Sequence, residues 1–456
     1  MRALSWAWSL AVAGALVAAL PWAVAHGGGD WRVFVSAGTL AGTAALLHPP
    51  QDWQAFFYLP GAAWPLVAAA RVPPAISFML NAAAMLGCAM AAAVLASRTY
   101  GLATRTAIAL YALFPPVVYA AAIIGQNAPF GLLLAQAAVA GLAARSVALT
   151  ALPIGMLLYK PTYALPLVAL LVVRGLRREL SVVAACAALW YLASVAAAGG
   201  DWSWPAAWLR LLTRFAAGDL AVNGAFAVGI PAVLLRNGVA PSAVLALCIL
   251  VAAASAGALR IAKPAEAASA ASLVGLALSP HAWAYDAALA LPMIAFTAAR
   301  LGDPARTRFL FALALVTPLF LLAPQIGFDP LAPAAAAGTI GWLAVRARQM
   351  LGRAPETPHD LHRERLERPV ERHPERLERG RTNVAFVDVP HRDEPAIRGG
   401  EALRPPPHPR LVPRGPERRQ NGVVARRGGD DRGERIGRET ESHEQRAVDR
   451  RVPEQI

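Results

Sequence analysis

Apolar residues in the first 352 positions come in long blocks, and short clusters of Arg, Gly and Pro separate the blocks. A spanning helix needs about 20 mainly apolar residues, and the chain can satisfy its backbone inside lipid only as a helix or a closed barrel. The blocks therefore predict an all-α polytopic membrane protein. The predicted spanning helices, about twelve in number, cover residues 4–25, 73–97, 106–123, 128–144, 147–158, 161–174, 180–197, 241–260, 266–279, 285–299, 309–323 and 332–348.

Basic residues at the ends of these blocks orient the predicted helices. Cytoplasmic loops of membrane proteins carry an excess of Lys and Arg. When both ends of the twelve-helix arrangement lie inside the cell, every cluster faces the cytoplasm, which favours a multi-pass protein of the plasma membrane. The clusters are Arg98/Arg105, Arg145, Arg174/Arg177/Arg178, Arg260/Lys263, Arg300/Arg306/Arg308 and Arg346/Arg348.

Some segments do not fit a simple series of spans. Residues 147–158 and 161–174 are short, which is tolerated where a broken helix pair lines a cavity. Residues 26–72 are rich in aromatic residues and prolines, and we expect an external loop with short interfacial helices. Residues 222–235 stay outside, as a re-entrant segment, or the helix count changes by one. Ala23-Val24-Ala25 resembles a cleavage site, but the length of the first block favours an uncleaved anchor.

The last part of the chain, residues 353–456, has a different composition. It holds 23 Arg and 20 Asp and Glu with few apolar residues, so it cannot bury a core and is predicted to be a disordered, cytoplasmic tail. The preceding membrane domain, residues 1–352, keeps 20 Lys and Arg against nine acids. The tail could be a regulatory arm or the product of mis-framed translation. Despite the formal net charge of +14, no finger, helix-turn-helix or aromatic-basic platform indicates a nucleic-acid partner.

Carboxylates are scarce in the membrane domain, because an unpaired charge in hydrocarbon costs several kcal/mol. Asp30 follows the first apolar block by five residues. At that place it keeps its charge, stays wet on one side and can act on a substrate held at the membrane. Glu179, Glu266 and Asp303 fall on the inner side, beside basic residues. The acids predicted at the outer side are Asp30, Asp52, Asp201, Asp219, Asp286 and Asp329.

Other polar residues also fall on the outer side, and they indicate a wet cavity with aromatic walls. Gln126 and Asn127 follow an apolar helix, and Lys160 lies between two short ones. Lys160 is either a lysine that reaches the interface or a cation for a lipid-linked phosphate. His281 is likewise either an interfacial residue or a phosphate contact. Asp286 lies at a predicted helix start, where a carboxylate interacts favourably with the helix dipole. This structural role alone would account for it.

These features, in this order, resemble glycosyltransferase family 87, the polyprenyl-phosphate-mannose-dependent mannosyltransferase-like proteins. The resemblance covers roughly residues 5–345. It rests on Asp30, Phe57-Tyr58-Leu59-Pro60, Gly125-Gln126-Asn127, Lys160-Pro161 with the apolar helix that ends in Arg174-Gly175-Leu176-Arg177-Arg178, Asn223, and Ser279-Pro280-His281-Ala282-Trp283-Ala284-Tyr285-Asp286.

The resemblance implies a GT-C fold and an inverting hexosyl transfer, with mannose as the first candidate. The donor would be a polyprenyl-phosphate sugar, and the acceptor a hydroxyl of an extracytoplasmic glycan or glycolipid. Asp30 would be the base. Lys160, His281 and Arg214 would bind the donor phosphate, and Tyr58, Gln126, Asn127, Asn223, Tyr285 and Asp286 the substrates.

No DxD-like acidic pair occurs in the membrane domain, so we expect no obligatory metal and no other cofactor. A transporter or flippase of lipid-linked or small polar substrates is the alternative function. Against it, the sequence has no internal repeat, and its polar residues collect at one face. A non-catalytic membrane protein is the third interpretation.

Overall fold

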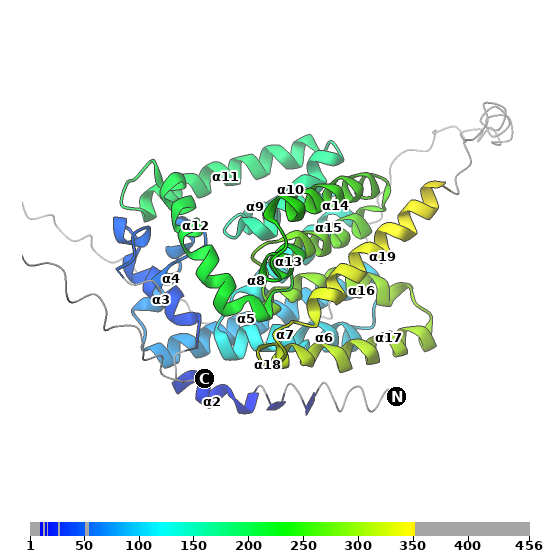
Figure 1. Cartoon of the computed structure of the whole chain (residues 1–456), viewed down its shortest axis with the longest axis horizontal. Helices are drawn as coiled ribbons and strands as arrows, with labels where there is room; N and C mark the ends of the chain where they lie inside the picture. The colour runs from blue at the N-terminus through cyan, green and yellow to red at the C-terminus, as the bar shows by residue number, and fades with distance from the viewer. Residues whose placement is uncertain (1–9, 12–13, 16, 26–27, 51–53, 352–456) are drawn as a thin grey trace, which may run out of the picture. The chain divides into compact units, whose positions relative to one another are not determined.

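The computed structural model describes residues 10–11, 14–15, 17–25, 28–50 and 54–351 (Figure 1). The predicted tail, Asp52 and much of the first predicted span lie outside these ranges. The described part is helical throughout, and its only β-type pairing is an isolated bridge between Ala227 and Trp283. The all-α prediction is confirmed for this part of the chain.

Prolines and glycines set the ends of many helices. Proline is favoured at the first helical position, where no intrahelical N–H bond is lost, and Pro74, Pro161, Pro241 and Pro264 stand there. The longer helices are α3 Trp31–Leu40, α5 Pro74–Tyr100, α8 Ala128–Ala143, α9 Val147–Leu157, α10 Pro161–Val173, α11 Arg177–Ala197, α12 Trp204–Asn223, α14 Pro241–Ile261, α15 Pro264–Leu278, α16 Leu291–Arg300, α17 Asp303–Val316 and α19 Leu331–Leu351.

Short helical pieces connect the longer ones. They are α2 Leu20–Ala25, η1 Ala44–Leu46, η3 Pro60–Ala63, α4 Leu66–Ala70, α6 Thr104–Ala112, α7 Pro115–Tyr119, η4 Ala120–Ile124 (a π-helical turn), η5 Gly224–Phe226, α13 Ile230–Arg236, η6 Ala284–Ala290, η7 Thr317–Leu322 and α18 Ala323–Ile326.

The helices are those of a membrane protein, although the predicted count of twelve spans is not confirmed. Among the described residues, four segments are long and apolar enough to cross a membrane: α5, α11, α14 and Asp303–Ile326. A fifth arises if α6 and Pro115–Ile124, which meet at a bend of 54°, form one span. The predicted blocks at 128–144, 147–158, 161–174 and 266–279 are apolar helices of 10–17 residues, namely α8, α9, α10 and α15.

The outer segments differ in how well the sequence predicts them. The short helices expected in residues 26–72 are present in its described part as α3, η1, η3 and α4. By contrast, the helix α12 lies mostly in a stretch between the predicted spans, where the sequence predicted no helix. Arginines and exposed positions interrupt its apolar pattern, so no block of spanning type marks it.

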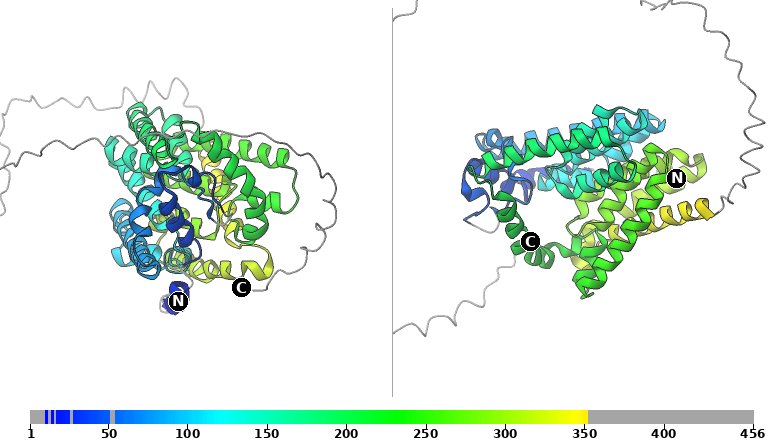
Figure 2. Two further views of the ribbon diagram at one scale, coloured as in Figure 1. Left: turned by 90° about the vertical axis from the view of Figure 1, so that its left-hand side faces the viewer. Right: turned by 90° about the horizontal axis from the view of Figure 1, so that it is seen from above.

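The helix α15 lies at the centre of the bundle, among α8, α10, α14, α16 and α19 (Figures 1 and 2). Every residue from Glu266 to Ala277 is buried, and most of them are Ala, Ser or Gly. Small residues let helix backbones approach closely where no water drives their association. At Gly275 a Cβ would lie 2.1 Å from Cγ of Pro166 on α10, so this contact requires glycine.

Charged groups separate to the two ends of the central helices. Lys160 precedes α10, whereas Arg174 ends it and donates to the carbonyl oxygens of Leu259 and Ala262 at the end of α14. Glu266 in the first turn of α15 accepts from Trp342 Nε1 at 3.1 Å and from Arg346 Nε at 2.8 Å. The arginines at 174 and 346 thus lie at the helix ends opposite Lys160.

The Glu266–Arg346 ion pair is buried, and its loss has a large expected cost. Glu266→Ala leaves the guanidinium without its carboxylate, and the free energy of unfolding should fall by about 3–5 kcal/mol. The measurement is chemical or thermal unfolding in detergent. The control is Asp303→Ala, which breaks the exposed Asp303–Arg306 pair and should cost less than about 1 kcal/mol. Equal effects of the two variants would contradict the prediction.

Candidate functional site

The carboxylate of Asp30 stands at the start of α3, beside the end of η4. The backbone N–H of Asp30 donates to the carbonyl oxygen of Ile124 at 3.0 Å. Gly125 follows with a φ of +74°, and a Cβ there would lie 2.6 Å from Cβ of Trp31. Only glycine fits this turn without strain. The turn brings Gln126 against Asp30, and Gln126 Nε2 donates to Asp30 Oδ2 at 2.5 Å.

The surroundings of Asp30 favour its protonated form. Burial raises the pKa of the Asp30 carboxyl, while the hydrogen bond from Gln126 and the charge of Lys160 lower it. The charges of Asp219 and Asp286 raise the pKa further, and the net shift is upward. The charges of Lys160, Asp219 and Asp286 therefore all act on Asp30, although 256 positions separate Asp30 from Asp286 in the sequence.

Gln126 connects Asp30 to two tyrosines. Its Oε1 accepts from the hydroxyl of Tyr58 at 2.8 Å, and its Nε2 lies 3.4 Å from the hydroxyl oxygen of Tyr285. Tyr58 is held in place from a different part of the chain. The N–H of Leu59 donates to the carbonyl oxygen of Tyr159 at 3.0 Å, and the rings of Tyr58 and Tyr159 stack with centroids 5.8 Å apart.

Lys160 forms a buried ion pair with Asp286. The distance from Lys160 Nζ to Asp286 Oδ1 is 2.7 Å, and the two residues are 6% and 0% exposed. Lys160 Nζ also donates to the hydroxyl oxygen of Tyr163 at 2.9 Å, and that hydroxyl donates to Asp286 Oδ1. Asp286 Oδ2 accepts from the N–H of Trp283 at 2.9 Å. Lys160 therefore does not extend to an interface, and one of its three N–H donors has no partner among the described residues.

Aromatic rings surround the ammonium group of Lys160. Its Nζ lies 4.1 Å from the ring centroid of Tyr163, 5.4 Å from that of Tyr285 and 5.7 Å from that of Tyr58. The ring faces attract a cation where water is scarce. They also form a continuous aromatic wall from Lys160 to Gln126.

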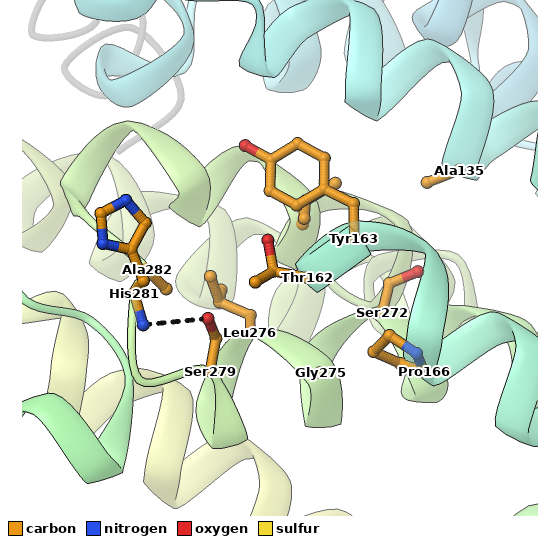
Figure 3. A pocket seen from close by; sticks show the side chains of 11 residues that line it. Ala135, Thr162, Tyr163, Pro166, Ser272, Gly275, Leu276, Ser279, His281 and Ala282 are labelled. Atoms are coloured by element: carbon orange, nitrogen blue, oxygen red, sulfur yellow. Dashed lines mark hydrogen bonds between the residues drawn. The ribbon is translucent and has the colours of Figure 1, made fainter. Parts of the chain in front are cut away.

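A second polar group joins His281 to Asp219 and Asn223. His281 Nδ1 lies 2.9 Å from Asp219 Oδ2, and Asn223 Nδ2 donates to Asp219 Oδ1 at 2.7 Å. The imidazole ring packs edge-on against Phe57 and Trp283. Because Asp219 holds the Nδ1 side, the Nε2 side remains available to a ligand. Figure 3 shows His281 beside a small cavity, with its backbone N–H donating to Ser279 Oγ at 3.2 Å.

Two predicted site residues lie at the edge of these groups. Arg214 is exposed on α12, with its guanidinium 5.2 Å from the ring of Phe215, and this ring contacts Phe57. Asn127 occupies the N-cap position of α8 without a side-chain capping bond, and its Oδ1 is buried without a hydrogen-bond partner. The hydroxyls of Tyr159 and Thr162 are unpartnered in the same way. Buried polar groups normally have partners, so these three atoms mark places where a polar ligand would complete the bonding.

A groove of about 260 Å³ lies between α10, α14 and α15. Its lining is mainly Ala, Val, Leu and Pro, and it includes the buried, unpartnered hydroxyls of Thr162 and Ser255. A separate cavity of about 10 Å³, lined in part by Tyr163 and His281, lies next to it (Figure 3). The two spaces share Thr162, Pro166, Gly275 and Ser279.

The structure therefore brings most of the predicted site residues together. Asp30, Gln126, Tyr58 and Tyr285 form one connected group, and Lys160 with Asp286 forms the next. His281 and Asn223 meet through Asp219, while Arg214 and Asn127 stand at the margins. In the described part of the chain, no three His, Cys, Asp or Glu side chains gather as metal ligands would.

Sequence reasoning missed three participants: Asp219, Tyr159 and Tyr163. One signal was available, because the chain has only 8 tyrosines and two of them flank Lys160 closely. Tyr163 lies one turn after Lys160 and therefore on the same side of α10. Asp219 had no comparable signal, since its partner His281 is far away in the sequence and α12 was not predicted.

Comparison with known families gives one match. The family model described as glycosyltransferase family 87 matches residues 56–280. This range contains Tyr58, Gln126, Lys160 and Asn223, and it ends before Asp286. No curated protein and no solved structure matches the chain.

Because the Lys160–Asp286 pair is buried, we expect its loss to lower the free energy of unfolding. Lys160→Met leaves a fully buried carboxylate without its cation, and the free energy of unfolding should fall by about 3–5 kcal/mol. Adding Asp286→Asn removes the uncompensated charge and should recover part of this loss. Both are measured by unfolding in detergent.

Lys263→Met is the matched control, because Lys263 is the chain's other lysine and is exposed. Its expected effect is within about 0.5 kcal/mol. A Lys160→Met protein as stable as Lys263→Met would contradict the buried pair.

Proposed function

Because the chain belongs to glycosyltransferase family 87, we propose that this membrane glycosyltransferase moves a hexose, mannose as first candidate, from a polyprenyl-phosphate donor to a hydroxyl of a glycan or glycolipid. The site is on the extracytoplasmic side of the plasma membrane, on a GT-C-type fold. The observation that carries the proposal is the joint placement of one carboxylate, Asp30, and one buried cation, Lys160, on the same aromatic wall.

The proposed reaction is a single inverting displacement. The acceptor oxygen attacks the anomeric carbon and forms the new C–O bond as the bond from that carbon to the donor phosphate oxygen breaks. The acceptor proton passes to Asp30, and the bonding electrons leave with the polyprenyl phosphate. Asp30 then releases its proton to water, which restores the carboxylate.

Asp30 suits the role of base because its proton affinity is raised. Burial and the nearby Asp219 and Asp286 raise the pKa of its carboxyl, which brings the pKa closer to neutral pH. A general base works best when its pKa lies near the operating pH. A hydrogen bond from Gln126 engages only one of its oxygens.

The leaving phosphate needs positive charge, and its bond to the anomeric carbon needs no proton donor. Lys160 would donate its remaining N–H to the phosphate. The surrounding aromatic rings exclude water, so this charge-assisted hydrogen bond would be strong. His281, held by Asp219 through Nδ1, directs Nε2 toward the ligand, and Arg214 adds charge at the rim. Asp286 keeps Lys160 in place through their ion pair.

The sugar and the acceptor need hydrogen-bond partners, and the site has unused ones. Asn127 Oδ1 and the Tyr159 hydroxyl are buried without partners, which suits ligands that carry several hydroxyls. Tyr285, Tyr58 and Asn223 would line the rest of the proposed sugar and acceptor site. The polar groups collect at one end of α10 and α15, an arrangement that favours a transferase over a transporter with a site at the middle of the membrane.

The groove between α10, α14 and α15 would hold the apolar chain of the donor. It is lined mainly by apolar side chains, and it shares four lining residues with the small cavity beside Tyr163 and His281. A polyprenyl chain in this groove would present its phosphate near Lys160. The chain would gain affinity from burial of its hydrocarbon surface.

The base assignment predicts the effect of Asp30→Asn and the pH dependence of the wild type. The variant should fold and bind donor, but kcat should fall by about 10²–10⁴-fold. In the wild type only the carboxylate form accepts a proton, so kcat should fall as the pH drops through the raised pKa, above the ordinary value of 3.8. The assay measures glycosylated product in proteoliposomes.

The control for this experiment is Asp201→Asn. Asp201 accepts from Ser203 at the start of α12 through Oδ1, and Asn retains that oxygen, so activity should not change. Full transfer by Asp30→Asn would show that another group is the base. Movement of lipid or solute without covalent product would favour the transporter.

The groove assignment predicts a dependence on donor chain length. Ala252→Trp fills the groove and should raise KM for a long-chain donor about tenfold or more, since each buried CH₂ contributes about 0.8 kcal/mol. The KM for a donor with a truncated chain should stay the same. Ala253→Trp, on the exposed side of α14 and outside the groove lining, is the control. Equal changes in both variants would exclude the groove.

A further inference from the structure

We propose that Gln126, locked by Tyr58, is a positioning residue that sets the orientation and the proton affinity of Asp30. This inference rests on the proposed function, because it assigns a task to the base of that reaction. It also departs from the expectation that Gln126 and Tyr58 contact the substrate.

The hydrogen bonds of Gln126 fix which way its amide points. The hydroxyl of Tyr58 donates to Oε1 at 2.8 Å, so Oε1 cannot turn toward Asp30 without losing this bond. Burial raises the pKa of the Tyr58 phenol well above its ordinary value of 10.0, so the hydroxyl keeps its proton and remains a donor. The NH₂ group must then face Asp30, as the 2.5 Å contact to Oδ2 records.

The same bonds leave Gln126 little capacity for a substrate. Its amide has two N–H donors, of which one is taken by Asp30 and the other points to the hydroxyl oxygen of Tyr285 at 3.4 Å. The residue is 5% exposed. Its polar atoms are thus directed at protein groups, and its influence on the reaction passes through Asp30.

A donated N–H stabilises the carboxylate more than the carboxylic acid. Burial would otherwise push Asp30 toward the protonated form, in which it accepts no proton from an alcohol. Gln126 offsets part of that effect and holds one oxygen of the carboxylate. The second oxygen, Oδ1, stays available for the acceptor hydroxyl.

A second tyrosine–glutamine pair in the protein provides the comparison. The hydroxyl of Tyr111 donates to Gln136 Oε1 at 2.7 Å, and both residues are fully buried between α6 and α8. Gln136 Nε2 has no partner among the described residues. The two pairs differ in what the amide NH₂ meets, so only the Tyr58–Gln126 pair can act on a carboxylate.

The test is the pH dependence of kcat for Gln126→Leu, assayed with the full-length enzyme in proteoliposomes. Loss of one hydrogen bond to a charged group should move the acid limb to higher pH by about one to two units. Activity should recover as the pH rises. Tyr58→Phe frees the amide to rotate and should move the limb in the same direction by less.

Gln136→Leu and Tyr111→Phe are the matched controls, since each removes the same atoms from the buried pair that has no carboxylate. Neither should move the limb. The inference is overturned if Gln126→Leu lowers kcat equally at every pH, or if Gln136→Leu shifts the limb as much.

A direct titration keeps the inference testable if Gln126→Leu has no measurable activity. Infrared spectra over a pH series identify the protonated-carboxyl band that Asp30→Asn removes. The midpoint of that band should be higher in Gln126→Leu than in the wild type, and an unchanged midpoint overturns the inference. Wild-type-like transfer by Asp30→Asn would instead refute the proposed base, while the infrared midpoint still reports on Gln126.

Discussion

The ion pair between Lys160 and Asp286 is the interaction on which the site depends. An ammonium group buried among three tyrosine rings is stable only with a counter-ion, and Asp286 provides it from a segment 126 positions away. The pair joins the start of α10 to η6. That junction brings Tyr163, Tyr285 and Tyr58 around one point, and through Tyr58 and Tyr285 it reaches Gln126 and Asp30.

Most of the longer helices could be predicted from the sequence, because each of these follows from a local pattern. Apolar blocks, prolines at helix starts and arginines at helix ends are all readable within about 20 residues. The scarcity of acids likewise singled out Asp30, and the polar residues at 126, 160 and 286 stood out within apolar surroundings. The helix α12 was missed, because Arg210, Arg214 and Asp219 interrupt its apolar pattern.

The connections among these residues could not be predicted in the same way. The contacts of Gln126 with Asp30 and Tyr285 join positions 96 and 159 apart, and such pairings are set by how the helices pack. Sequence alone could not show that Lys160 meets Asp286, nor that Asp219 meets His281. The π-helical turn Ala120–Ile124 and the positive φ of Gly125 together orient Gln126 toward Asp30. These backbone conformations also depend on tertiary contacts. Local irregularity of this kind is common at functional sites.

The separation of Asp30 from Lys160 has a consequence for the proposed reaction. The charge of Lys160 lowers the pKa of the Asp30 carboxyl and offsets part of the effect of burial, so it favours the carboxylate form that a base requires. As the sugar leaves, negative charge grows on the phosphate beside Lys160 and offsets the field that Asp30 experiences. The pKa of Asp30 must then rise while the acceptor hydroxyl is losing its proton. In the proposed reaction, cleavage of the donor bond and proton transfer to the base therefore assist each other through one shared cation.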